Sequence, residues 1–511
     1  MITDWIEIGE VSAERDTNLI NYFYDAGVSA KIVNNPKQYL LLGRKGAGKT
    51  AVYMHLIQTP QSVFKDGDAV VGLSLQSYNW QAHNLLSNDL RSGGFQHRDS
   101  WRFVISVESI KAIVSCLKKE GKDLPKPIAK ATAVLEKLFS SPIPSWTDLL
   151  GTKLFSLATA KLPELGSGED GIIFGGGELS FEKIKESTTL KNQLNQNIEN
   201  LTDWFEKCLE SAPSHMRVFL AFDRLDEAWV TDFISESKSI LSGLLHASEH
   251  VLQKFGGRIR PLIFLREDIF STFEINDRNK LREDCSESLR WSQDDIEKLA
   301  LERINYYAKR AGKPLLSSLQ EIFLEKEMRS RTTPIRHLYN RTMGRPRDMV
   351  AFLGRTFVTA RAEKLCSSDG NKILTRAIYA AEPGYSEYLF EELSDEWRNQ
   401  NPSFLEYLRT LENLRYAAIT TEELELALTT KGFIKERADF RNIVRFLFEN
   451  SIIGITVGDS KQWRYKCFYQ NQAFLDTDVI KTHPGLIKRL GLTEGASDRA
   501  GKSGVESISE E

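Results

Sequence analysis

A glycine-rich loop near the N-terminus constrains the fold of this 511-residue chain more than any other feature. The apolar run that begins at Gln38 predicts a buried strand, residues 43–50 read GRKGAGKT, and the residues that follow have the apolar spacing of a helix. A strand, a tight turn and a helix in this order begin a parallel α/β unit, because parallel strands need a long crossover connection. Further apolar strands, separated by helices, are predicted at 66–80, 217–222 and 260–266. We therefore expect a parallel sheet with helices on both faces.

The loop has the spacing Gly43-x4-Gly48-Lys49-Thr50, which is the Walker A pattern of P-loop NTPases. Its glycines let backbone N–H groups surround a β-phosphate, and the helix N-terminus adds its positive end. Lys49 is expected to reach the β- and γ-phosphates, and Thr50 to bind Mg²⁺. The loop is therefore predicted to hold ATP and Mg²⁺ through Gly43, Arg44, Lys45, Gly46, Ala47, Gly48, Lys49 and Thr50.

Acidic residues follow the strand predicted at 217–222, in the sequence RVFLAFDRLDE. Asp223 ends a buried strand, where a carboxylate is costly, and is predicted to hold Mg²⁺ together with Thr50. Asp226 and Glu227 follow within one turn, and either fits the residue that polarises the attacking water. The sequence leaves this choice open, with a slight preference for Asp226. Acids at helix starts also serve as caps, which is the alternative interpretation.

Two arginines are candidates for sensing the γ-phosphate. Arg266 ends the strand predicted at 260–266, and its alternative is a surface ion pair with Glu267 or Asp268. Arg347 lies in the segment Gly344-Arg345-Pro346-Arg347-Asp348, before an apolar helix, and would reach the nucleotide from there. Its alternative is a solvent-facing cap salt bridge.

Changes in pattern along the chain predict four parts. Residues 1–291 form an α/β P-loop ATPase domain with a mostly helical insertion at about 75–190, residues 292–385 an all-helical lid, residues 386–492 a winged-helix domain, and residues 493–511 a disordered tail. The insertion contains a glycine-rich hairpin candidate around residues 166–177. The winged-helix prediction combines three helical stretches with a hairpin over 451–469, whose turn is Gly458-Asp459-Ser460.

These segments, with FLREDIF, LRWSQDDIEKLALERI, GRPRDMVAFLGR and THPGLIKRLGL, together resemble the AAA+/STAND-like bacterial P-loop ATPases. The subfamily that they resemble is named after a cyanobacterial protein and is often encoded in anti-phage defence islands. The resemblance covers residues 1 to about 490 and implies an ATPase core, a helical lid and a winged helix, as in origin-recognition ATPases. The Gly-Asp-x-Arg lid motif of those ATPases is similar to Gly344–Arg347, with Arg345 in the position of the acid. It also implies a nucleotide-gated switch, a homo-oligomer and a separate effector protein. Arg278, Arg282 and Arg290 lie in the stretch where such rings place an arginine finger, and the sequence does not rank them.

The charge balance limits the partners of the chain. With 67 Lys+Arg against 70 Asp+Glu, the net charge of -3 excludes a polycation, so any DNA contact must be local. A basic face is expected from Arg437, Arg441 and Arg445 at helical spacing, with Lys461 and Arg464 on the hairpin. A solvated face or a protein contact is the alternative interpretation of this stripe.

Cysteine usage and hydropathy give the remaining limits. The five cysteines are scattered without a CxxC pair, which argues against a disulfide framework or a zinc knuckle. The N-terminus lacks the pattern of a signal peptide, and apolar runs are short, so a cytoplasmic protein without membrane contact is expected.

The sequence thus predicts an ATP-hydrolysing switch that controls assembly or a separate effector, in anti-phage defence by the family resemblance. Two alternatives stay open at this point. One is a scaffold that holds nucleotide without appreciable turnover, and the other is a winged-helix DNA-binding ATPase.

Overall fold

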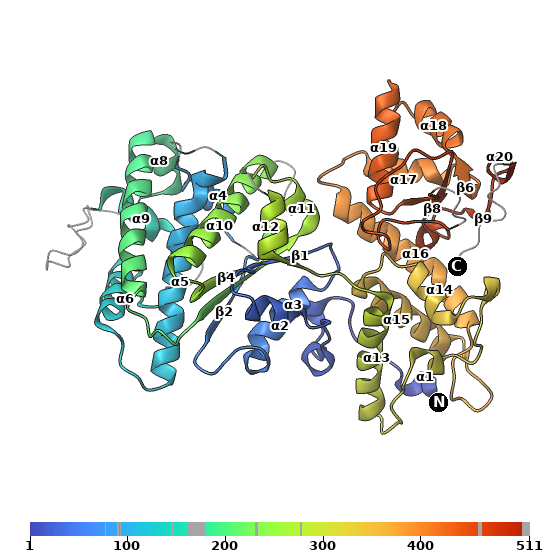
Figure 1. Ribbon diagram of the computed structural model, residues 1–511, viewed down its shortest axis with the longest axis horizontal. Helices are drawn as coiled ribbons and strands as arrows, with labels where there is room; N and C mark the ends of the chain where they lie inside the picture. The colour runs from blue at the N-terminus through green and yellow to red at the C-terminus, as the bar shows by residue number, and fades with distance from the viewer. Residues whose placement is uncertain are drawn as a thin grey trace. The chain divides into compact units, whose positions relative to one another are not determined.

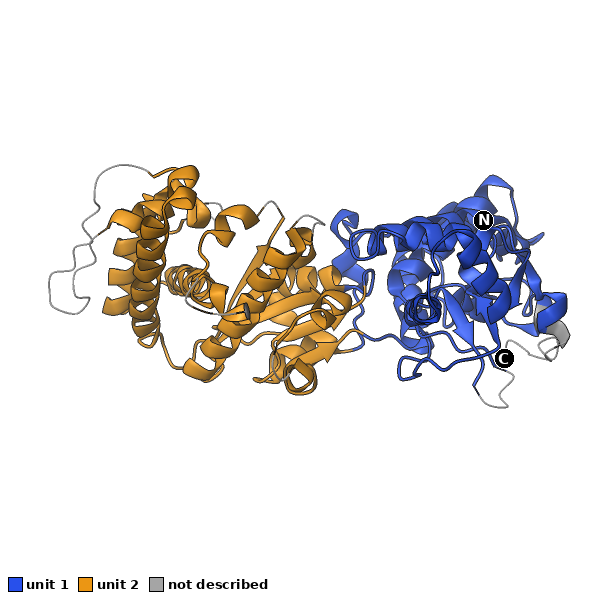
Figure 2. Cartoon of the chain, turned by 90° about the horizontal axis from the view of Figure 1, so that it is seen from above, with its two compact units in different colours: residues 1–26, 45–48, 290–511 blue, residues 27–44, 49–289 orange. Residues whose placement is uncertain are grey.

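The computed structural model describes residues 1–76, 78–88, 91, 93–144, 148–160, 179–229, 233–275, 278–457 and 462–502 (Figure 1). The chain forms two compact units (Figure 2). Unit 1 comprises residues 1–26, 45–48 and 290–511, and unit 2 comprises residues 27–44 and 49–289. Each unit has a hydrophobic core of its own. The crown of the glycine loop, residues 45–48, thus belongs to unit 1, whereas the rest of the loop belongs to unit 2.

Unit 2 is built on a five-stranded sheet in which every pair of neighbours is parallel. Its strands are β1 (Leu40–Gly43), β2 (Ala69–Ser74), β3 (Val218–Asp223), β4 (Ile259–Arg266) and β5 (Ser286–Ser288), in the order β2-β3-β4-β1-β5. Every residue of β1, β3 and β4 is buried, as expected for apolar strands covered on both faces. The predicted parallel sheet is confirmed, and β5, a short polar strand, is an addition that the apolar pattern did not predict.

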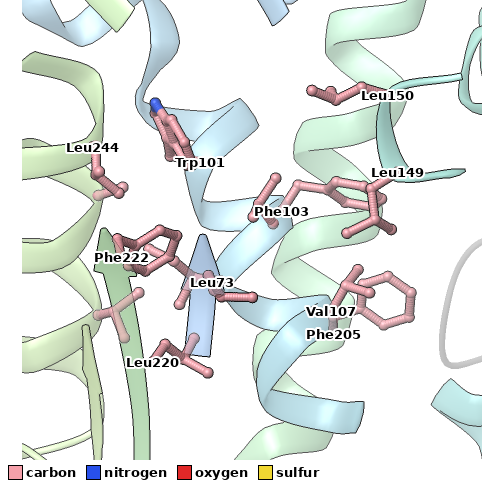
Figure 3. Close-up of a cluster of buried hydrophobic side chains, with 14 of the residues drawn as sticks. Leu73, Trp101, Phe103, Val107, Leu149, Leu150, Phe205, Leu220, Phe222 and Leu244 are labelled. Carbon is pink, nitrogen blue, oxygen red and sulfur yellow. The ribbon is translucent and has the colours of Figure 1, made fainter. Parts of the chain in front are cut away.

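Helices cover both faces of this sheet. The helices of unit 2 are α2 (Val28–Asn34), α3 (Lys49–Gln58), α4 (Trp80–Asn84), α5 (Arg98–Lys119), α6 (Lys126–Phe139), α7 (Thr152–Phe155), α8 (Phe181–Glu186), α9 (Thr188–Leu209), α10 (Ile234–Lys254), α11 (Glu267–Ser271) and α12 (Arg278–Cys285). Side chains of a strand alternate between faces. On one face Phe264 contacts Tyr53 of α3, at 5.9 Å between ring centroids. On the other, Phe222 packs against Trp101 of α5 at 5.8 Å, within the cluster drawn in Figure 3.

The insertion expected at 75–190 is helical in its described part and continues the core of the sheet rather than forming a core of its own. Its helix α5 is joined to α9 by a buried ion cluster, in which Arg102 bonds Glu206 at 2.7 Å and Asp99 at 3.0 Å. The hairpin candidate at 166–177 lies outside the described residues.

Unit 1 contains the N-terminal segment, which we expected within the ATPase domain. Its helices are α1 (Ile2–Trp5), α13 (Gln293–Arg310), α14 (Pro334–Asn340), α15 (Pro346–Ala362), α16 (Arg376–Trp397), α17 (Phe404–Glu412), α18 (Thr421–Thr430), α19 (Arg437–Glu449) and α20 (Asp498–Lys502). Ile2, Ile6 and Ile8 are buried in its core, and Arg303 of α13 donates to the Ile8 carbonyl at 2.9 Å. These contacts hold the first residues of the chain in unit 1.

The boundary that we expected between the lid and the winged-helix domain, at 385/386, falls inside α16. Tyr385, Leu389 and Leu393 continue the buried face of this helix across the expected boundary. One hydrophobic core therefore runs through both predicted parts.

The C-terminal part of unit 1 holds a second sheet, in the order β7-β8-β6-β9. Its strands are β6 (Tyr416–Thr420), β7 (Ile453–Ile455), β8 (Val479–Thr482) and β9 (Thr493–Ala496). The hairpin predicted over 451–469 is present in part, because an antiparallel bridge joins Ile455 to Arg464. Among the described residues, β7 pairs along its whole length with β8 instead. All four residues of β8 are buried, as expected for a strand that lies between two others, β7 and β6. The predicted turn at 458–460 lies outside the described residues, and the winged-helix assignment stays a prediction.

The tail expected at 493–511 is ordered over its first ten residues, so that prediction is wrong there. β9 pairs in parallel with β6, and Ser497 donates its backbone N–H to the Ala418 carbonyl at 2.9 Å. The composition of this segment is poor in large apolar residues, but main-chain pairing does not need them. Residues 503–511 lie outside the described part of the chain.

Among the helices described above, none combines the length and the apolar character needed to cross a bilayer.

Candidate functional site

Those residues of unit 2 that are predicted to bind nucleotide and Mg²⁺ lie at the carboxyl edge of its sheet. Gly43, the last residue of β1, lies opposite Arg266, the last residue of β4. Asp223 ends β3, the other neighbour of β4, and α3 begins at Lys49 directly after the loop. Ligands of open α/β sheets bind at this edge, where loops leave the strands. The sheet therefore places Asp223, the predicted metal ligand, and Arg266, the predicted sensor, at the same edge as the start of α3.

The loop has a conformation that requires glycine. Gly46 and Gly48 have φ of +79° and +99°, in the left-handed region that other residues rarely adopt. Lys49 folds its amine back over the loop and donates to the carbonyl oxygens of Gly43 and Arg44, both at 3.1 Å. Burial lowers the pKa of Lys49, and the charge of Asp226 opposes that shift. An ammonium has three donors, so one remains for a ligand.

Asp223 is buried, with 3% of its surface exposed. Burial raises its pKa to about 6, although the Arg224 N–H and the Thr50 hydroxyl hydrogen-bond to its carboxylate. Its Oδ2 atom has no hydrogen-bond partner among the described residues. A buried carboxylate oxygen without a partner is costly, and oxygen is the ligand that Mg²⁺ prefers. Thr50 and Asp223 therefore fit a magnesium site of the kind completed by phosphate and water, which needs no cluster of several carboxylates.

The two candidates for polarising water differ in their surroundings, although both are exposed. Asp226 Oδ2 lies 3.7 Å from Arg266 Nη1, and among the charges that act on the pKa of Lys49 that of Asp226 is the largest. Glu227 instead lies 3.3 Å from Arg224, which precedes it by three residues. The fold thus brings Asp226 toward Lys49 and Arg266, and pairs Glu227 elsewhere.

Arg266 combines features of both interpretations made from the sequence. It forms the ion pair with Asp268, through Nε at 3.1 Å and Nη2 at 2.7 Å. It is nevertheless buried, with 9% of its surface exposed. The two parallel bonds fix the plane of the guanidinium at the edge of the sheet.

Within unit 1, Arg345 holds the crown of the loop. It is buried and donates from Nη1 to the Lys45 carbonyl at 3.1 Å and to Glu396 at 2.9 Å, and from Nε to Asp348 at 2.9 Å. Burial alone would lower its pKa, but the Asp348 and Glu396 carboxylates more than offset burial and raise it. The arginine that stands where the resembled lid motif has an acid is thus compensated by two acids from the same unit.

Arg347 lies against the loop, also within unit 1. A Cβ added to Gly46 would come within 3.2 Å of the Arg347 side chain. Arg347 Nη1 donates to Glu392 at 3.0 Å, and the same carboxylate lies 3.6 Å from Lys45 Nζ. Burial opposes ionisation of Glu392, but these two cations outweigh it and lower its pKa. Arg347 therefore sits at the crown in a half-buried pair rather than in a solvent-facing cap.

The crown is held by hydrogen bonds to its backbone carbonyl groups. Besides Lys45, the Ala47 carbonyl accepts a bond from the indole of Trp291 at 2.8 Å. The N–H groups of Gly46, Ala47 and Gly48 donate to no described residue. Unpaired N–H groups in a glycine loop are the donors that phosphate oxygens accept from.

Sequence reasoning missed three residues of this arrangement. Glu392 and Glu396 are one helical turn apart in α16, and this i, i+4 pair of acids on a half-buried face was the available signal. Trp291 gave no signal, because a single tryptophan near a domain boundary is compatible with many roles.

The predicted basic face is present in part. Arg437, Arg441 and Arg445 are exposed along α19, and Arg441 pairs with Asp476 at 3.1 Å. Arg464 is half-buried and donates to Gln472 at 2.8 Å, whereas Lys461 lies outside the described residues.

Comparisons with known proteins match a family model, a curated relative and solved structures. Residues 294–394 match a family described as FunZ-associated C-terminal helical domain. The chain is 24% identical over 370 residues to the putative transposon gamma-delta 80.3 kDa protein of Escherichia coli (strain K12), a match that covers 70% of this chain and 47% of that protein. The chain therefore spans about half the length of this relative. Among solved structures, Cdc6p from Pyrobaculum aerophilum matches over 92% of each chain at 12% identity, with a TM-score of 0.29, a value too low to support an argument.

Proposed function

We propose that this chain binds MgATP at residues 43–50 and hydrolyses it, and that it works as a nucleotide-dependent switch. The observation that carries the proposal is the buried carboxylate of Asp223. Thr50 donates a hydrogen bond to this carboxylate, but its Oδ2 atom has no hydrogen-bond partner among the described residues. The glycine loop with its free amides and the folded-back amine of Lys49 support it.

Before hydrolysis, the glycine loop holds the phosphates of bound ATP. Backbone N–H groups of residues 46–48 bind phosphate oxygens, and the Lys49 amine exchanges a carbonyl of its own loop for the β- and γ-phosphates. Thr50 and Asp223 hold Mg²⁺, which when bound neutralises charge that develops on the phosphates. The apolar strand around Asp223 keeps water away from its carboxylate.

For the hydrolytic step we assign Asp226 as the residue that orients the attacking water. It is exposed, so water reaches it, and Arg266 at 3.7 Å fixes the direction of its carboxylate. Arg266, held by Asp268, and Arg347, which lies against Gly46, are the residues that we propose sense the γ-phosphate.

The switch itself involves the crown. Lys45 and Arg347 share Glu392, and a triphosphate would compete with this carboxylate for both cations. Loss of that competition after hydrolysis would restore the pair. The state of residues 45–48 would then report the nucleotide to the rest of unit 1.

A homo-oligomer, a separate effector and a role in anti-phage defence belong to this proposal and rest on the family resemblance. The relative with a transposon protein's name is consistent with mobile DNA as a setting. Among the arginines named for a finger, Arg282 pairs with Glu267 at 2.9 Å and Arg278 bonds backbone carbonyls, whereas Arg290 is exposed. We therefore favour Arg290.

The test is steady-state phosphate release from ATP, with ATP binding measured separately. Lys49→Ala should lose binding and turnover, and Asp226→Asn should bind ATP but lose turnover about 100-fold or more. Glu227→Gln is the matched control and should keep most activity. ATP binding without turnover in the wild type, alone or with DNA, would instead favour the scaffold.

The exposed arginines of α19 favour a second candidate function, binding of duplex DNA. Arg441→Glu with Arg445→Glu should then weaken duplex binding and reduce its salt dependence. Duplex affinity that is unchanged in this double variant would remove the candidate.

A further inference from the structure

A cavity of about 300 Å³ lies in unit 1, apart from every residue assigned above to nucleotide hydrolysis. Its walls come from α13, from α14, from residues 462–469 and from Pro484. The volume is at the lower end of the range that small-molecule sites occupy. The question is which ligand its chemistry would select.

Aromatic rings make up most of the apolar lining. Tyr339 and Phe468 lie 5.0 Å apart between centroids, and Trp463 and Tyr469 contribute further rings. Two of these rings make a cation–π contact. Lys481 Nζ lies 6.0 Å from the centroid of Trp463, and the Arg464 guanidinium lies 5.5 Å from the centroid of Tyr469. Flat, cation-backed walls suit a planar aromatic ligand that bears negative charge nearby.

The polar lining adds direction. The side-chain amide of Asn340 is half-buried and bonds to no described residue, so it has both a donor and an acceptor to offer. The exposed side chain of Arg336 donates to Gln293 at 3.2 Å, and among the described residues no carboxylate pairs with it. Among the described residues that line the cavity, none is Asp or Glu. This donor set disfavours a metal ion and favours an anion next to a group with hydrogen-bonding edges.

We propose that this cavity binds the nucleobase of a nucleotide, with the base stacked on the aromatic walls, Asn340 on its edge and Arg336 on the attached phosphate. An aliphatic side chain or lipid tail would leave the Asn340 amide unpaired, which the nucleobase does not. The same chemistry is presented by a free mononucleotide and by an unpaired nucleotide of single-stranded DNA. The proposal does not depend on the ATPase proposal, because it uses none of the same residues.

The test uses the full chain with Lys49→Ala, so that the phosphate loop does not contribute. One arm titrates dTMP and AMP by calorimetry, and the other titrates a fluorescein-labelled single-stranded thymidine oligonucleotide by anisotropy. Tyr469→Leu should weaken binding about tenfold, because stacking of one base is worth roughly 5- to 150-fold. Asn340→Ala should weaken binding by a similar factor, because the edge of the base loses its hydrogen-bond partner. Tyr469→Phe should restore binding, and Arg376→Ala, an exposed arginine of α16 outside the cavity, should leave it unchanged.

The two arms separate the sources of the ligand. Oligonucleotide binding much tighter than that of dTMP identifies single-stranded DNA, and equal affinities identify a free nucleotide. Photocrosslinking of an oligonucleotide that carries 5-iodouracil should label the peptide containing residues 463–469. The proposal is overturned if neither probe binds, if both cavity variants bind as the parent does while melting normally, or if the crosslink maps to α19.

Discussion

Replacing Asp223 by Asn is expected to stabilise the nucleotide-free protein, although it removes a proposed metal ligand. The pKa of Asp223 is raised from 3.8 to about 6 by burial. The folded state thus binds this proton more tightly than the unfolded state, and stability is lost as the pH rises from about 4 to about 6. The raised pKa corresponds to about 3 kcal/mol of lost stability above that window. Asn has the same shape, carries no charge and still accepts a bond from Thr50.

The pH dependence identifies the cause. The advantage of Asp223→Asn should be about 3 kcal/mol at pH 8, roughly half of that at pH 5 and small at pH 4. For a unit of this size, about 3 kcal/mol raises the melting temperature by about 6 °C or more. Scanning calorimetry of the nucleotide-free protein at these three pH values measures the difference, and comparison with the wild type at each pH cancels the titration of other groups.

Two controls make the outcome decisive. Glu227→Gln, an exposed acid four residues along the chain, should leave the melting temperature unchanged at every pH. MgATP should raise the melting temperature of the wild type and have much less effect on Asp223→Asn. A variant that melts below the wild type at pH 8, or whose advantage is the same at pH 4 and pH 8, would refute the assignment of a buried, unpaired carboxylate.

Three further predictions follow from the same contacts. Glu392→Gln frees Lys45 and Arg347 and should tighten ATP binding about fivefold, since two half-buried ion pairs are worth about 1 kcal/mol in total, whereas the exposed neighbour Glu391→Gln should not change it; equal affinities by calorimetry would contradict the competition. Gly46→Ala forces a side chain into a left-handed position and against Arg347, so a loss of ATP binding with a destabilisation of about 1 kcal/mol or more is expected, and retained ATP affinity would show that the crown is not part of the site. Glu206 has its pKa lowered to about 2 because bonds from His250, Arg102 and Lys254 outweigh its burial, so its contribution is present above about pH 4.5 and is lost as the pH falls toward 2; Glu206→Gln should therefore unfold with a weaker acid dependence, and an unaltered acid transition would refute this.

The sequence predicted the elements that have strong periodic or positional signals. The strands β1, β3 and β4 are apolar runs, and the loop after β1 has a fixed spacing, so the sheet and the edge that holds Asp223 and Arg266 could be inferred from them. β5 is short and polar and gave no such signal. The same limit applies to β9, which is held by main-chain pairing in a segment whose composition resembles that of a tail.

The parts that the sequence did not predict depend on contacts between distant segments. The N-terminal residues belong to unit 1 because Arg303 and Arg361 bond their carbonyls, and carbonyl groups carry no sequence information. The boundary at 385 was placed where the motif pattern changes, yet the buried face of α16 continues through it. Core continuity is a property of packing, which a motif does not report.

Arg345 illustrates how a departure from a motif is compensated in three dimensions. An arginine buried without acids would cost several kcal/mol, so its presence requires carboxylates within bonding distance. Asp348, three residues along α15, and Glu396, from α16, supply them. The remaining donor of this cluster reaches the Lys45 carbonyl, so the charge that an acid would have put at the crown is replaced by a hydrogen bond to its backbone. The indole N–H of Trp291 donates in the same way to the Ala47 carbonyl. The crown is thus held through its carbonyl oxygens, while its N–H groups at residues 46–48 bond to none of the described residues and can bind an anion. A loop backbone that is rigid before it binds an anion loses little entropy on binding, which favours high affinity.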